Sequence, residues 1–255
     1  MTHHLPSPLL VVEASTTAGS VALIVDGVVA AERSLRMGPS RDDALLPAIA
    51  GVLKDAHIAP HEIRAIACGS GPGSFTSLRI AASLCKGLSV ANDAPLYAIP
   101  SLLLAAATLT STPGRYVLHA EALRSERYVV RVEVMANGAL AMSSVSRVPL
   151  DGLELLAADE NATLLSVGAA DNPREKNGLT EGSVTERSVT ESVATDSTFP
   201  TVRVLQPHAR NVVFLASMWN TFGPIPIETW EPDYGRLAEA QVKWEFTHGR
   251  ALPAG

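Results

Sequence analysis

A glycine-rich turn at residues 69–73 is the part of this sequence whose residue types best suit ligand binding. An apolar run at 63–68 leads into the turn, GSGPG, and a segment with helical spacing begins at Ser74. A strand, a tight turn and a helix start, in this order, direct backbone N–H groups toward an anion. Ser74 and Thr76 are also residue types that cap helices. The pattern fits either an anion-binding loop or a plain turn, because Gly-Pro-Gly punctuates many loops that bind nothing.

Two known phosphate-binding motifs fit this turn poorly. A P-loop, GxxxxGK[ST], requires a glycine where this chain has Ser74, and the next lysine, Lys86, lies far along the helix. The dinucleotide pattern GxGxxG is matched only up to Thr76, and a meander of strands, not a βαβ unit, opens the chain. We therefore expect neither motif to operate here.

Other catalytic or metal-binding sets cannot be assembled from the spacing. His57 and His61 are four residues apart, but Pro60 disfavours a helix between them, so a solvated turn is expected. His119 alternates with apolar neighbours, as a core or edge histidine does. The sequence contains no GxSxG nucleophile elbow. These observations favour a partner protein with no catalytic residues and no metal site of its own.

The composition predicts a well-formed core and no strong binding of nucleic acid by this chain alone. Of the 255 residues 47% are apolar, and 20 Lys and Arg stand against 26 Asp and Glu, for a net charge of −6. Proteins that hold nucleic acid unaided usually carry a basic patch. If RNA is involved, we expect a partner to supply most of the phosphate contacts.

Cysteine usage and hydropathy predict a cytoplasmic protein that does not contact membranes. Cys68 and Cys85 lie in apolar surroundings, which indicates buried, reduced thiols in a reducing compartment. The apolar run at 9–12 is too short for a signal peptide, and no run approaches the roughly 20 apolar residues that span a bilayer. A nucleophilic Cys85 is disfavoured, because no histidine or aspartate companion is evident.

Hydrophobic periodicity predicts eight elements in the first half of the chain, in the order β-β-β-α-β-α-β-α. Asp26-Gly27 predicts a type I′ hairpin between the second and third strands. The predicted strands are 9–14, 20–25, 28–32, 63–68 and 95–99, and the predicted helices are 45–56 with its start at 39–43, 74–90, and 102–109 capped by Ser101. This order indicates a mixed sheet with helices packed on it, and not a doubly wound Rossmann sheet.

The second half of the chain predicts another, smaller α/β unit after a boundary at 110–115. Its predicted strands are 116–120, 128–134, 139–148 after the Asn137-Gly138 turn, 163–167 and 202–205, and its helices are 150–158 and 207–223, before an extended tail from 224. Residues 171–200 are rich in Ser, Thr and Glu and predict a flexible insertion. We therefore divide the chain into subdomains at 8–109 and 115–255.

Four short motifs resemble those of the TsaB (YeaZ) family. The most specific is GPGSFTSLRI at 71–80, and it is supported by LLVVEAS at 9–15, EALRSERY at 121–128 and PDYGR at 232–236. The sequence departs from the family pattern at Glu13 and Glu121, where aspartates are usual, at Ser77, where glycine is usual, and at 41–43, which read Arg-Asp-Asp. Partner surfaces that depend on these positions are expected to differ.

The resemblance implies an actin- and sugar-kinase-like (ASKHA) α/β fold of two related subdomains with mixed sheets. It also implies a non-catalytic subunit that forms a heterodimer with TsaD and works with TsaE. That complex uses ATP to transfer a threonylcarbamoyl group to adenosine of tRNA, forming N6-threonylcarbamoyladenosine. This chain alone is expected to bind no cofactor and to meet tRNA only through the complex. A homodimer in the absence of TsaD, and an independent ATP-binding phosphotransferase or protease, are the alternatives.

The resemblance also implies two sets of site residues. The partner interface is expected on two helices, at Leu45, Leu46, Ile49, Leu53, Ile80, Leu84 and Leu88. The loop motif, a candidate nucleotide or anion site, comprises Gly71, Gly73, Ser74, Phe75, Thr76 and Arg79.

Overall fold

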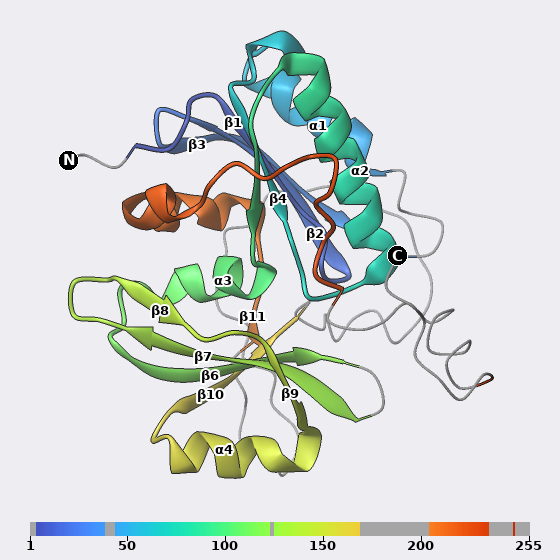
Figure 1. Cartoon of the computed structure of the whole chain (residues 1–255). Coiled ribbons are helices and arrows are strands. Elements are labelled where there is room, and N and C mark those ends of the chain that lie inside the picture. Colours follow the sequence, from blue (N-terminus) through green and yellow to red (C-terminus); the bar gives the residue numbers. More distant parts are fainter. Residues whose placement is uncertain (1–3, 39–43, 123–124, 169–203, 235–246, 248–255) are drawn as a thin grey trace, which may run out of the picture.

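The computed structural model describes residues 4–38, 44–122, 125–168, 204–234 and 247. The chain forms two β-sheets with helices between and outside them (Figure 1). The first sheet has five strands in the order β3-β2-β1-β4-β5. These strands span Leu9–Glu13 (β1), Ala18–Val25 (β2), Val28–Arg36 (β3), Ala65–Gly69 (β4) and Leu96–Ile99 (β5).

The first sheet is mixed, as its sequence predicts. Strands β1, β2 and β3 run antiparallel to one another, whereas β4 is parallel to β1 and β5 is parallel to β4. Asp26 and Gly27 join β2 to β3 with φ angles of 51° and 80°, the positive values that a type I′ turn requires. Helix α1 (Leu45–Asp55) follows β3, and α2 (Phe75–Asn92) joins β4 to β5. The predicted order of the first eight elements is confirmed.

The second sheet repeats the topology of the first. Its order is β11-β10-β6-β7-β8, with β9 also paired to β7. As in the first sheet, two antiparallel pairings are followed by parallel ones, β10 on β6 and β11 on β10. The strands span Gly114–Glu121 (β6), Glu126–Val134 (β7), Leu140–Met142 (β8), Ser146–Pro149 (β9), Thr163–Val167 (β10) and Val204–Leu205 (β11). The molecule therefore contains two related α/β subdomains with mixed sheets.

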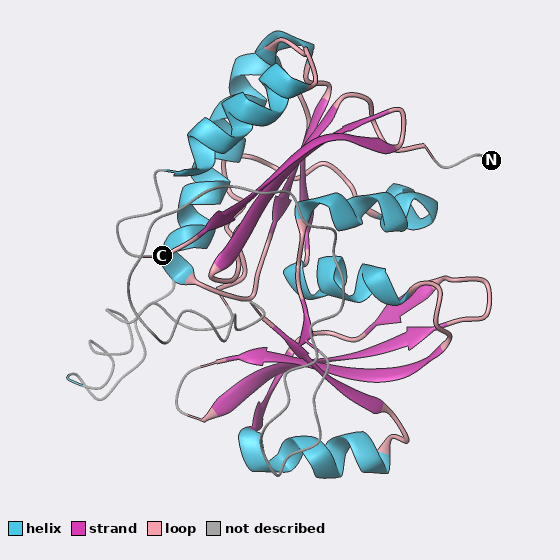
Figure 2. Cartoon of the chain, turned by 180° about the vertical axis from the view of Figure 1, so that it is seen from behind, coloured by secondary structure: helices cyan, strands magenta, loops and turns pink. Residues whose placement is uncertain are grey.

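Helices cover the outer faces of both sheets and fill the space between them (Figures 1 and 2). Helices α1 and α2 pack on the outer face of the first sheet, and α4 (Leu153–Asp159) packs on the outer face of the second. Helix α3 (Ser101–Ala106) and the 3₁₀ helix η6 (Ala209–Thr221) lie between the sheets. Among the described residues, further 3₁₀ turns span Pro60–Glu62 (η2), Ala107–Leu109 (η3) and Leu150–Gly152 (η4).

Helix α3 joins the cores of the two subdomains. All six of its residues are buried. Leu103 and Leu104 pack with apolar side chains of the first sheet, while Leu102, Ala105 and Ala106 pack with those of the second. A helix buried on every side is apolar all round, which explains why this segment shows no polar face in the sequence.

The position of η6 corrects the predicted extent of the second subdomain. The sequence assigns 115–255 to that unit, but η6 packs against the first sheet through Val212, Leu215 and Trp219. The Ala209 N–H at the start of η6 also donates to Ser20 Oγ on β2 at 2.9 Å. The spacing of the apolar residues indicated a helix correctly, but such spacing does not identify the sheet that the helix covers.

The structure also places three of the histidines for which the sequence made predictions. His57 and His61 are exposed around η2, as expected of a solvated turn, and His119 is partly buried on β6. The predicted helix start at 39–43, the insertion at 171–200 and the last tail residues, 235–237, lie outside the described residues. Among the residues that the structure describes, no helix is both long enough and apolar enough to cross a membrane.

Candidate functional site

The glycine-rich turn between β4 and α2 is packed tightly against other parts of its own chain. An added Cβ would lie 1.9 Å from Glu13 Oε2 at Gly69, 2.1 Å from the Asp233 carbonyl oxygen at Gly71, and 2.2 Å from the Ser15 carbonyl oxygen at Gly73. Contacts this short leave no room for a side chain at any of the three positions. The glycines therefore allow three separate segments to approach the turn closely.

The amides of the turn also donate to the protein itself. Ser70 N–H donates to the Ile99 carbonyl at 2.8 Å, Gly71 N–H to Ser101 Oγ at 3.1 Å, and Ser74 N–H to the Ser15 carbonyl at 2.8 Å. Pro72 has no amide hydrogen to donate. An anion-binding loop needs free amides aimed at its ligand, so these bonds favour the plain turn over the phosphate cradle.

A buried carboxyl group, that of Glu13, lies at the centre of this packing. Its side chain is completely buried at the end of β1. Oε1 accepts from Ser15 N–H at 2.6 Å, and Oε2 accepts from the Ser101 hydroxyl at 2.8 Å. Burial raises the pKa of Glu13, and the hydrogen bonds from Ser15 and Ser101 oppose that rise. The carboxyl group thus ties β1, the turn and the start of α3 together.

This network was missed by the sequence analysis, which treated Glu13 only as a departure from the family pattern. It also predicted that Ser101 caps the following helix, and that prediction is wrong. Pro100 occupies the cap position, and the Ser101 hydroxyl instead donates to Glu13 and accepts from Gly71 N–H. A serine before an apolar helix normally signals a cap, so no local pattern could have indicated the longer-range contact.

The N-terminus of α2 lacks the side-chain cap that the sequence predicts. Ser74 stands at the cap position, but its hydroxyl makes no hydrogen bond to the helix amides and lies 3.1 Å from Ser77 Oγ. Ser77, the residue that replaces the family's glycine, is buried. Thr76 is exposed, and the first turn contains no acidic residue. The start of α2 is therefore stabilised by neither a side-chain cap nor a favourable carboxylate.

Two of the motifs that carry the resemblance meet in space at this helix start. The Phe75 and Tyr234 rings lie 4.5 Å apart between centroids, and the Arg79 guanidinium lies 5.1 Å from the Phe75 centroid. The Tyr234 hydroxyl donates to Glu231 Oε2 at 2.9 Å. Burial and the Glu231 carboxylate raise the pKa of Tyr234 to about 12. The loop motif is therefore joined to residues 222–234, which follow η6 and which we call the C-terminal strap.

The predicted interface residues fall into two groups. Leu45, Ile49 and Leu53 are buried in the core between α1 and the first sheet, so the structure corrects their assignment to a partner surface. Leu46 is 54% exposed. Ile80, Leu84 and Leu88 are partly exposed on α2 and border the core. Adjacent leucines in a helix point in different directions, so Leu45 and Leu46 differ in exposure although they are neighbours in the sequence.

The two cysteines are close together beneath the turn. Cys68 on β4 and Cys85 on α2 are both free and fully buried, as the sequence predicts. The pKa of Cys68 is raised well above its usual value. The largest cause is a hydrogen bond with Cys85, and the second is burial of the thiol. The Cys68 thiol therefore remains protonated. Both cysteines act as small core residues.

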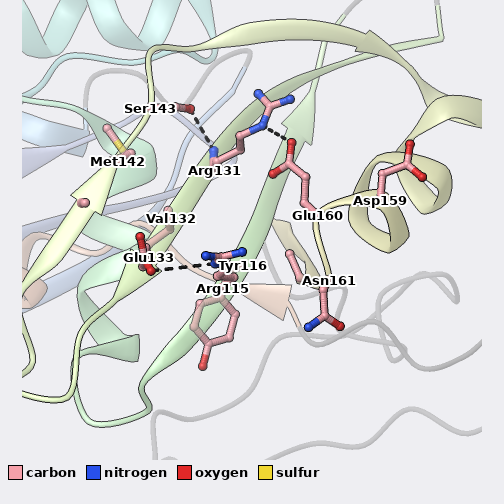
Figure 3. A pocket seen from close by; sticks show the side chains of 12 residues that line it. Arg115, Tyr116, Arg131, Val132, Glu133, Met142, Ser143, Asp159, Glu160 and Asn161 are labelled. Carbon is pink, nitrogen blue, oxygen red and sulfur yellow. Dashed lines mark hydrogen bonds and ion pairs between the residues drawn. The ribbon is translucent and has the colours of Figure 1, made fainter.

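A separate pocket of about 640 Å³ lies on the second subdomain, away from the loop motif. Figure 3 shows that it is bordered by two ion pairs, Arg115 with Glu133 and Arg131 with Glu160. The charges on its walls are largely paired with one another, and no residue predicted for the site lies in it. Within the described residues, no group of three or more His, Cys, Asp or Glu side chains could hold a metal ion.

Comparisons with known proteins agree with the motifs. A family model described as "TsaD: tRNA N6-adenosine threonylcarbamoyltransferase" matches residues 40–149. The tRNA threonylcarbamoyladenosine biosynthesis protein TsaB of Bacillus subtilis is 25% identical over 92% of this chain and 97% of its own length. The protein of the same name from Escherichia coli is 33% identical over 37% of this chain and 41% of its own length.

Solved structures show the same relationship. A Pseudomonas aeruginosa protein described as similar to peptidase YeaZ superposes with a TM-score of 0.67 at 26% identity, covering 91% of this chain and 100% of that one. YeaZ from the same organism gives 0.63 at 26% identity, covering 90% and 100%. The repeated mixed sheets with helices between them define an actin- and sugar-kinase-like fold. Within that class, the chain is similar to TsaB (YeaZ) proteins over about nine tenths of its length.

The different surroundings of Gly69 and Gly87 predict that alanine has opposite effects on protein stability at these two positions. Gly69→Ala places a methyl group against the Glu13 carboxylate, which hydrogen bonds hold on both oxygens, and should lower the free energy of unfolding by about 3 kcal/mol. Gly87, in α2, has no atom within 4 Å of an added Cβ. Gly87→Ala should therefore raise stability by about 0.5–1 kcal/mol. Urea unfolding of both variants measures this, and equal effects would contradict it.

The buried Glu13 predicts a particular dependence of stability on pH. Because its pKa is raised in the folded state, ionisation is easier in the unfolded chain. The contribution of Glu13 to stability should be largest below its unfolded pKa and fall as pH rises through the folded value. The Gln side chain in Glu13→Gln cannot ionise. The stability advantage of the wild type over this variant, measured as the difference in the free energy of unfolding, should therefore shrink as pH rises from about 4. Urea unfolding across pH 4–8 tests this, and a constant difference would contradict it.

Proposed function

We propose that this chain is a non-catalytic subunit that pairs with TsaD in forming N6-threonylcarbamoyladenosine in tRNA. The observation that carries the proposal is the match to the Bacillus subtilis TsaB biosynthesis protein over 97% of that relative's length. The match of residues 40–149 to the TsaD family model adds support, since related proteins often pair through related surfaces. In this proposal TsaE also takes part, the complex uses ATP, and tRNA meets this chain only through the complex.

Two features of the packing around the glycine-rich turn support a non-catalytic role. The Glu13 carboxyl group is completely buried and hydrogen bonded on both oxygens, so it acts on the fold and not on a substrate. The turn's amides at Ser70, Gly71 and Ser74 donate to the protein itself. This arrangement gives no support to the alternative of an independent phosphotransferase or protease. The net charge of −6 also agrees with a subunit that leaves tRNA binding to its partner.

The docking surface in this proposal is an open face of α2. It comprises the partly exposed Ile80, Leu84 and Leu88, together with Gly87, which has open space beside it. Spacings of three and four residues place these positions on one side of the helix. Leu46, exposed on the neighbouring helix α1, extends the apolar surface on the same side of the sheet. We call Ile80, Leu84, Gly87 and Leu88 the α2 face, and we assign TsaD as its occupant.

The role in tRNA modification predicts a defined change in the cell. Depletion of this protein should remove most N6-threonylcarbamoyladenosine from tRNA, because the transferase complex would lack a required subunit. Digestion of total tRNA to nucleosides, followed by mass spectrometry, measures the modified fraction. Expression of the wild-type chain should restore it. An unchanged level after depletion would overturn the proposal.

The docking surface predicts that Gly87→Arg blocks pairing without disturbing the fold. The added side chain has open space around it in the free protein, but it would place a charge and a long side chain in the interface. Affinity for the cognate TsaD, measured by calorimetry, should fall at least tenfold, or about 1.4 kcal/mol. Gly87→Ala is the matched control and should bind as wild type does.

Sedimentation of the lone wild-type chain and of its mixture with TsaD completes this test. A homodimer that persists in the mixture, or undiminished TsaD affinity in Gly87→Arg, would contradict the assignment of the α2 face to TsaD.

A further inference from the structure

The C-terminal strap crosses the first subdomain and ends at the second. Ile225 N–H donates to the Leu96 carbonyl on β5 at 2.9 Å, and farther along Asp233 N–H donates to the Ser70 carbonyl at 2.8 Å. Ile227 and Trp230 pack against the core beneath α2. Figure 1 shows this segment, in orange-red, passing from η6 across the first subdomain toward the junction of the two sheets.

The strap covers one stripe of α2. Tyr234 packs on Phe75, as described above, and Lys86 contacts both Trp230, with Nζ 5.7 Å from the ring centroid, and Glu231, at 3.5 Å. At 3.6 residues per turn, positions 75 and 86 lie on the same side of the helix. The residues of the α2 face occupy other positions around the helix: Ile80, Leu84 and Leu88 border the core and stay partly exposed, and Gly87 has open space beside it.

Tyr234 connects three parts of the molecule at the start of α2. Its ring contacts Phe75, the first residue of the helix, and its carbonyl accepts from the Tyr128 hydroxyl of β7 at 3.4 Å. The carbonyl of the preceding residue, Asp233, occupies the space that a Gly71 side chain would need. Asp233 and Tyr234 together thus link the glycine-rich turn, the first turn of α2 and the second sheet.

The start of α2 requires such external support. Its first amides lack a side-chain cap, and its first turn lacks an acidic residue, so neither of these two local devices opposes fraying at this end. Packing of an aromatic ring on the first residue compensates for that deficit. Binding is tighter when the docking element is already ordered, because less conformational entropy is lost on association.

We propose that Tyr234 is a positioning residue whose ring orders the first turn of α2 and thereby presents the α2 face to its partner. The part of this inference that concerns the partner rests on the proposed function. The part that concerns the order of the helix stands on the contacts of Tyr234 alone. We assign this role to the ring and not to the hydroxyl, because the ring contacts Phe75, the first residue of α2, whereas the hydroxyl interacts with two exposed side chains, Glu231 and Arg79.

Truncation of the ring and removal of the hydroxyl test this inference separately. Tyr234→Ala should speed hydrogen exchange in the first turn of α2, where Leu78 N–H donates to the Ser74 carbonyl at 2.9 Å, by at least tenfold relative to the second half of the helix. It should also weaken binding to TsaD about fivefold to tenfold. Tyr234→Phe keeps the ring and should behave as wild type in both measurements.

Tyr97→Ala is a matched control for the loss of an aromatic contact. Tyr97, on β5, is partly exposed like Tyr234, and its ring lies 4.8 Å from that of Trp219 at a similar tilt. The pair lies on the opposite face of the first sheet from α2. This variant should lower stability while leaving the exchange pattern of α2 and the affinity for TsaD unchanged.

The outcomes separate the inference from the proposed function. Wild-type exchange and affinity in Tyr234→Ala would overturn the positioning role, as would equal losses in Tyr234→Phe and Tyr234→Ala. A fall in TsaD affinity in Tyr97→Ala as large as in Tyr234→Ala would show a general effect of stability and would also overturn it. Failure of the wild-type chain to bind TsaD would refute the proposed function, while the exchange measurements would still decide the role of Tyr234.

Discussion

The buried Glu13 carboxyl group is the interaction on which the arrangement of this molecule depends. A carboxyl group without solvent contact is unfavourable unless its oxygens are hydrogen bonded, and here both are. The donors come from Ser15, after β1, and from Ser101, at the first position of α3. Ser101 also accepts from the amide of Gly71. The same bonds that satisfy the carboxyl group therefore fix where α2 begins and where α3 enters the space between the sheets.

That network explains why the glycine-rich turn has a different role from the one its sequence first suggests. A turn rich in glycine before a helix is typical of phosphate-binding loops, and the local pattern contains nothing to exclude that function. The difference comes from residues far away in the chain. Glu13, Ser15 and Asp233 fill the space that each glycine leaves open, so the glycines permit contacts within the protein.

Much of the fold could be predicted because its signals are local. Asp26-Gly27 defines a hairpin by its backbone angles, and continuous apolar runs such as β1 and β4 indicate strands covered on both faces. Contacts between distant segments left no such signal. Helical spacing revealed η6 but not the sheet that it covers. A serine before α3 read as a cap because a cap is its commonest local role.

The candidate surface was predicted only in part, for a related reason. Leu45 and Leu46 look equivalent in the sequence, yet one is buried and the other exposed, since successive helix residues point about 100° apart. Phe75 and Tyr234 belong to two motifs that could each be recognised alone. Their contact became visible only in three dimensions. It is this contact that turns two separate family motifs into one structural unit.

The position of η6 between the sheets has a consequence for how the chain is made. The inner face of the first sheet is completed by η6, which lies near the other end of the sequence. During synthesis, β1 to β5 and α3 emerge first, with apolar side chains that have no cover until residues 209–221 leave the ribosome. Exposed apolar surface of this kind favours aggregation. The core of the first subdomain is thus completed only when the last third of the chain has been made.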